Sequence, residues 1–112
     1  MSLSLTALIK ALSENPEKQV FAKVGTPEDH RILPVSLVDC SLIENSNLLE
    51  LNLGKMGDLN ASSILASIEK DIVNTETVTV TLWEEDGERR DVSRATLTGN
   101  SIVLLDSRLQ AV

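Results

Sequence analysis

Apolar residues recur at helical spacing in two separate segments of the chain. The first stripe consists of Leu5, Leu8, Ile9 and Leu12. This i, i+3, i+4, i+7 spacing is typical of an amphipathic helix, and 61–68 repeats it 61 − 5 = 56 residues later. Ser4 and Asn60 stand at the two starts and are good N-cap residues. The pattern therefore predicts two helices, the first ending at Asn15-Pro16 because a residue before proline avoids the helical region.

Six segments have the β-branched, apolar composition of strands. They are 20–24, 31–43, 48–53, 78–82, 89–97 and 102–105. Gly99-Asn100 and Asp86-Gly87 are two-residue hairpin signals between such segments. Each half of the chain thus reads as one helix followed by three strands, with 20–24 corresponding to 78–82.

The repeated order predicts an α+β fold made of two αβββ units in tandem, related by internal duplication. We expect one domain over 1–112, with a first unit at 3–54 and a second at 59–106. The alternative is that a small α+β chain shows two helices and six strands by chance. The expected arrangement is a mainly antiparallel six-stranded sheet with both helices on one face.

The two faces of the predicted strands differ in composition. Val20, Ala22 and Val24 alternate with residues that point the other way, as do Val78, Val80 and Leu82. These apolar sets fit the face that meets the helices. The opposite face carries both aromatic residues and predicts a protein-interaction surface of Phe21, Lys23, Thr79, Thr81 and Trp83. The alternative is that sheet curvature or the C-terminal tail covers the two rings.

Composition narrows the classes of function. The 112 residues carry 10 basic and 17 acidic side chains, a net charge of −7, which argues against binding a nucleic-acid backbone. A single cysteine excludes an internal disulfide and a multi-cysteine zinc site. No apolar run reaches the length of a membrane span. We expect a cytoplasmic protein with no membrane or nucleic-acid partner and no cofactor.

Two groups of residues could carry chemistry. His30 and Cys40 could form a nucleophile and base, but ten residues of extended strand separate them by about 30 Å. The acidic hairpin 84–91 could bind a divalent cation, although it lacks calcium-loop spacing. The alternative for that hairpin is a solvated turn whose carboxylates are neutralised by Arg89, Arg90 and Arg94.

These observations favour a small, acidic, non-enzymatic interaction or regulatory module that self-associates as a homodimer. Two alternatives remain open. The order helix, three strands, helix, two strands, together with the acidic charge, resembles type III secretion chaperones, which implies binding of a partner segment; those proteins end in a helix, whereas this chain ends in a strand. The acidic hairpin 84–91 would instead suit a small metal-dependent hydrolase.

Overall fold

The computed structural model describes residues 3–43, 46–54, 57, 59–71, 78–84 and 89–109, with the side chains of 40–43, 46–48, 71, 78 and 79 left outside that description. The elements follow one another as α1 (Leu5–Glu14), β1 (Gln19–Gly25), β2 (His30–Ile43), β3 (Ser46–Leu53), α2 (Ala61–Asp71), β4 (Val78–Trp83), β5 (Arg89–Thr98), β6 (Ser101–Asp106) and the 3₁₀ turn η2 (Ser107–Leu109). The predicted order, one helix and three strands in each half, is therefore confirmed.

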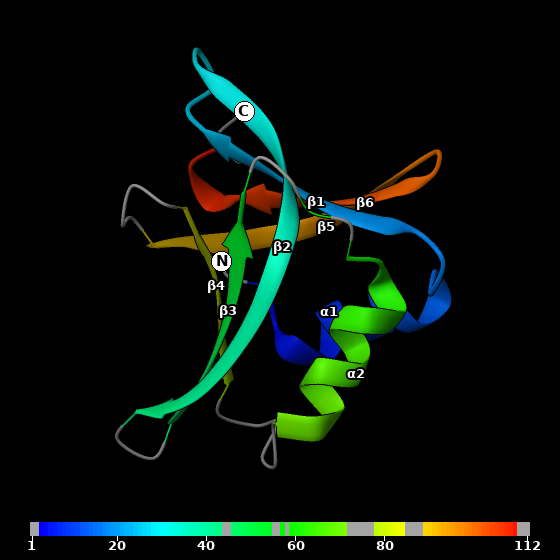
Figure 1. Ribbon diagram of the computed structural model, residues 1–112. Helices are drawn as coiled ribbons and strands as arrows, with labels where there is room; N and C mark the ends of the chain where they lie inside the picture. The colour runs from blue at the N-terminus through cyan, green and yellow to red at the C-terminus, as the bar shows by residue number, and fades with distance from the viewer. Residues whose placement is uncertain are drawn as a thin grey trace.

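The six strands close into a barrel in the order β1-β2-β3-β4-β5-β6 (Figure 1). Four neighbouring pairs are antiparallel, whereas β1 and β6 are parallel and β3 and β4 are parallel. The predicted mainly antiparallel open sheet with helices on one face is therefore wrong. Each parallel pair joins the two halves of the chain. Together these pairs leave no free edge, so the sheet has an inside and an outside.

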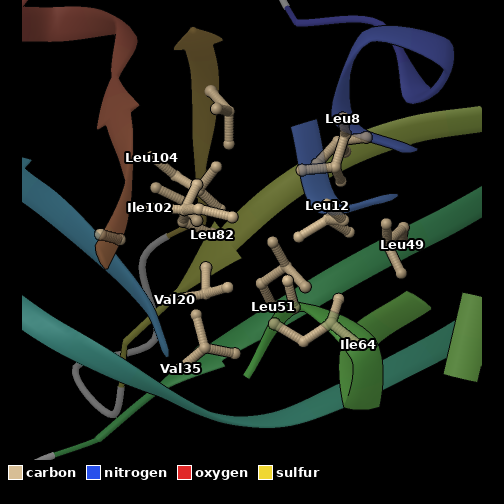
Figure 2. Packing of buried hydrophobic residues seen from close by; sticks show 14 of the residues in the cluster. Leu8, Leu12, Val20, Val35, Leu49, Leu51, Ile64, Leu82, Ile102 and Leu104 are labelled. Atoms are coloured by element: carbon tan, nitrogen blue, oxygen red, sulfur yellow. The ribbon is translucent and has the colours of Figure 1, made fainter. Parts of the chain in front are cut away.

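The barrel interior and the two helices share one apolar core. Alternate residues of every strand point inward, as the buried Val20, Ala22 and Val24 of β1 illustrate. The helices lie side by side at one end of the barrel (Figure 1). Figure 2 shows Leu12 of α1 and Ile64 of α2 gathered beside Leu49 and Leu51 of β3. The helical stripes predicted from the sequence are thus the faces that cover the barrel core.

Both helices begin in the same way. The Ser4 side chain accepts a hydrogen bond from the Ala7 N–H at 3.1 Å, and the Asn60 side chain accepts one from the Ser63 N–H at 2.9 Å. Each bond satisfies a backbone donor that the first helical turn leaves without a partner. The two predicted N-caps are confirmed. The first helix also ends where expected, because Glu14 is its last residue and Asn15 its C-cap.

A β-bulge occurs at the equivalent place in each half. The register of β2 against β3 shifts between Val35 and Leu37, and that of β5 against β6 shifts between Val92 and Arg94. The bulged residues are Ser36 and Ser93. Their hydroxyls donate to the carbonyls of Asn52 and Leu105 at 3.1 and 3.2 Å, respectively. A bulge bends its strand, so β2 and β5 each turn a corner of the barrel and belong to two sheets.

The pairing registers correct the predicted match between the halves. Phe21 pairs with Pro34, and Thr81 pairs with Asp91. Pro34 lies two residues before the bulged Ser36, and Asp91 lies two residues before the bulged Ser93. Phe21 therefore corresponds to Thr81, and β1 matches β4 with an offset of 81 − 21 = 60 residues instead of the 58 taken from the sequence. The unit boundaries 3–54 and 59–106 stay predictions.

Candidate protein-interaction face

One side of the barrel presents an apolar outer surface. It is formed by the end of β5, by β6 and β1, and by the start of β2, and we call it outer face A. Two cross-strand rows make it up: Thr96, Val103, Phe21 and Pro34 in the first, and Arg94, Leu105, Lys23 and Ile32 in the second. Ile32 is 57% exposed, and Phe21, Pro34, Val103 and Leu105 are half-buried. Outer face A thus carries five apolar side chains that do not belong to the buried core.

The opposite side of the barrel, outer face B, is built from the equivalent segments. Its two rows are Asp39, Glu50, Thr81 and Asp91, and Leu37, Asn52, Trp83 and Arg89. Polar contacts run across it, because Asn52 donates to Asp39 at 2.7 Å and Arg89 pairs with Glu50 at 2.8 Å. Leu37, which is 55% exposed, and the half-buried Trp83 are its apolar members.

The two faces act as an internal comparison, because they share backbone geometry and differ in side chains. In the pairing registers, Val103 of outer face A corresponds to Glu50 of outer face B, and Pro34 corresponds to Asp91. Outer face B therefore carries charged residues at two positions that are apolar on outer face A. The fold therefore does not require apolar residues there. Apolar side chains on an outer surface whose positions tolerate charge are typical of a binding surface.

The structure divides the predicted interaction residues between the two faces. Phe21 and Lys23 lie on outer face A, whereas Thr81 and Trp83 lie on outer face B, because β1 and β4 are three strands apart in the barrel. Thr81 is only 7% exposed and adds little surface. Thr79 pairs with Leu48 of β3, and its side chain falls outside the described part. Sequence reasoning missed Val103, Leu105, Ile32 and Pro34, which surround Phe21.

Charged side chains occupy the interior of the barrel at one end. Glu84, Arg90 and Asp106 continue the inward-pointing rows of their strands and are 5%, 8% and 0% exposed. Arg90 pairs with Glu84 at 2.9 Å and with Asp106 at 3.4 Å. Arg31 also pairs with Glu84, and Arg108 pairs with Asp106 at 2.9 Å. Burial of these carboxylates is thus matched by arginines, as buried charges require.

The same cluster fastens the end of the barrel. Asp106 accepts a hydrogen bond from the Gly25 N–H at 3.2 Å, and so joins the end of β6 to the β1–β2 turn. Gly25 has φ +118, which favours glycine. A cavity of about 450 Å³ beside the cluster is lined by Arg89, Arg90, Asp91, Asp106, Ser107 and Arg108. The buried residues of this lining, Arg90 and Asp106, pair with one another. We therefore interpret the charged cluster as stabilising the fold.

The remaining candidates for chemistry are not brought together by the described residues. His30 begins β2 and Cys40 lies in the same strand, which runs continuously from His30 to Ile43 apart from its bulge.

In the acidic hairpin, Glu84 points inward to Arg31 and Arg90, and Asp91 is exposed on outer face B. Glu85, Asp86 and Glu88 lie outside the described residues. Among the residues that are described, no group of three His, Cys, Asp or Glu side chains could hold a metal.

Comparison with protein-family models, with curated proteins and with solved structures finds no match for this chain. In the part of the chain that the structure describes, no helix is long and apolar enough to cross a membrane. Among the described residues the longest helix is α2, with 11 residues.

Proposed function

We propose that this protein is a small, non-enzymatic interaction module that binds another protein surface through outer face A. The observation that carries the proposal is the row Val103, Phe21, Pro34 with Leu105 and Ile32 beside it, on a face whose equivalent accepts charged residues. We also propose the cytoplasm as its location, which cell fractionation would test.

The arrangement of outer face A supports binding by packing rather than by strand addition. The barrel is closed, so neither β1 nor β6 offers a free edge to an incoming strand. A partner would instead lie over the side chains. Specific interfaces have an apolar centre with a polar rim. Here the polar Thr96 lies next to Val103 in the first row, and Lys23 and Arg94 lie in the second row beside Phe21 and Val103.

The proposed partner surface can be tested in cells by photocrosslinking. A p-benzoylphenylalanine residue is placed at position 21, within outer face A, or at the more exposed position 32. The matched control carries the same group at Ala66, an exposed position of α2 that belongs to neither outer face. After irradiation, adducts are separated by mass.

We expect discrete adducts from positions 21 and 32 and none of the same mass from position 66. Folding of each variant is checked by circular dichroism, so that an unfolded chain is not counted. Folded chains that give no adduct from either outer-face position, or the same adducts from position 66, would overturn the proposal.

A further inference from the structure

We infer that the partner of outer face A is outer face B of a second copy of this chain, in a head-to-tail contact. This inference rests on the proposed function and names its partner. Three observations carry it: the charges of the two faces, their apolar content and their places on the barrel.

The charges of the two faces are opposite. Outer face A carries Lys23 and Arg94, a total of +2. Outer face B carries the acidic Asp39, Glu50 and Asp91 and the basic Arg89, which gives −3 + 1 = −2. Opposed charges of this kind select a partner and its orientation. The chain as a whole carries −7, so two copies repel unless the contact itself is complementary.

The same charges disfavour the symmetric alternative. A two-fold dimer through outer face A would place Lys23 and Arg94 of both copies around one apolar centre, with a total of +4. A dimer through outer face B would gather −4 in the same way. The head-to-tail contact instead neutralises both sets.

Apolar side chains are available on both sides of the head-to-tail contact. Leu37 and Trp83 on outer face B provide an aliphatic and an aromatic group opposite Phe21 and Ile32 of the next copy. Tryptophan is enriched among residues that dominate binding energy.

The positions of the faces predict how the assembly grows. β1 and β6 form the middle of outer face A, and β3 and β4 form the middle of outer face B, on the far side of the closed barrel. Each copy then keeps one free face after the first contact. Such contacts produce a ring or an open chain rather than a closed dimer. We therefore expect the wild-type mass to rise beyond that of a dimer with concentration.

The strand β2 supplies a matched pair of variants for a test. Ile32 lies before the Ser36 bulge on outer face A and is 57% exposed, whereas Leu37 lies after it on outer face B and is 55% exposed. Ile32→Asp and Leu37→Asp therefore introduce the same carboxylate at equally exposed aliphatic positions. Light scattering and sedimentation velocity then measure each variant alone and in an equimolar mixture, and circular dichroism melting confirms that each is folded.

A head-to-tail contact predicts that each variant alone associates about 30-fold or more weakly than wild type, because each replaces an apolar side chain of the contact with a charged one that the contact would bury. The mixture recovers a 1:1 dimer and nothing larger, because only the intact outer face B of Ile32→Asp can meet the intact outer face A of Leu37→Asp.

Other outcomes would overturn the inference in distinguishable ways. Association lost in Ile32→Asp but kept in Leu37→Asp would indicate a symmetric contact, and the proposed function would stand. A monomeric wild type whose position 21 crosslinks to a different protein would also overturn the second-copy partner alone. Wild-type association unchanged in both variants, with no crosslink from position 21 or from position 32, would overturn the proposed function as well.

Discussion

The charged end of the barrel yields a sharp prediction, because the other half of the chain provides its apolar counterpart. Glu84, Arg90 and Asp106 point into the barrel and pair with one another. The registers place them at the positions equivalent to Val24, Leu33 and Leu53. The fold thus accommodates either an ionic or an aliphatic trio at these positions.

Removing one member of the ionic trio is expected to be strongly destabilising. Asp106→Leu removes a carboxylate that pairs with the Arg90 guanidinium, whose side chain is 7% exposed, and it removes the acceptor of the Gly25 N–H. Breaking a buried pair costs about 3–5 kcal/mol. For a chain of this size that corresponds to a fall in Tm of roughly 12–20 °C.

Replacing all three members is expected to restore the stability. Adding three single losses of about 3–5 kcal/mol would predict a chain that does not fold, because domains of this kind have about 5–15 kcal/mol in total. The triple variant Glu84→Val, Arg90→Leu, Asp106→Leu instead leaves no buried charge of the trio. Because the Gly25 N–H still loses its acceptor, we expect its free energy of unfolding to lie within about 1–3 kcal/mol of that of wild type, well above the value expected from the sum of the single losses.

Urea unfolding followed by circular dichroism measures both variants. Arg89→Leu is the control, because this side chain is 59% exposed and its pair with Glu50 lies at the barrel surface, where such a pair should contribute less than about 1 kcal/mol. An Asp106→Leu variant within about 1 kcal/mol of wild type, or a triple variant less stable than Asp106→Leu, would contradict the coupling of the three buried charges.

Three further predictions concern the fold. Leu12→Ala, at a fully buried position of α1, should lower the free energy of unfolding by about 2–5 kcal/mol in the same urea assay; a loss under about 1 kcal/mol would contradict its place in the core. Ser36→Ala and Ser93→Ala should each cost about 1 kcal/mol and agree with one another in thermal melts, whereas a cost at one bulge alone would show that the bulges are not equivalent. Gly25→Ala should cost at least about 1–3 kcal/mol, because a Cβ there would lie 2.3 Å from the Asp29 carbonyl oxygen at φ +118; calorimetry showing an unchanged Tm would contradict this.

The helices and strands could be predicted from the sequence because their signals are local. The helical spacing of Leu5, Leu8 and Leu12, the caps Ser4 and Asn60, and the turn at Gly99-Asn100 act over a few residues, and each is confirmed. No contact distant in the chain was needed to recognise them.

Closure of the barrel could not be predicted, because it depends on contacts between distant segments. The pairing of Val20 with Ile102 joins strands at the two ends of the chain. Alternating apolar residues look the same whether they face a helix layer or a barrel interior. The expected open sheet followed from the first of these two arrangements.

The error in topology also explains the error in the site. Phe21 and Trp83 share a face only if β1 and β4 belong to one open sheet, and closure separates them. The inward charges had a usable signal, since Glu84 and Asp106 stand two residues after the inward Leu82 and Leu104. Strand alternation places them inside, yet a carboxylate at a strand end is easily taken for part of a solvated turn.

The two alternative functions considered from the sequence, a secretion chaperone and a metal-dependent hydrolase, stay predictions.

Head-to-tail association is tested most directly by a dilution series of amide and indole N–H correlation spectra of the wild-type protein. Head-to-tail association predicts concentration-dependent shifts on both outer faces, at Phe21 and Val103 and at the indole N–H of Trp83, the single tryptophan of the chain. The exposed surface of α2 around Ala66 should not shift. Shifts confined to the helices, or spectra independent of concentration from the micromolar to the millimolar range, would contradict head-to-tail association through the two outer faces.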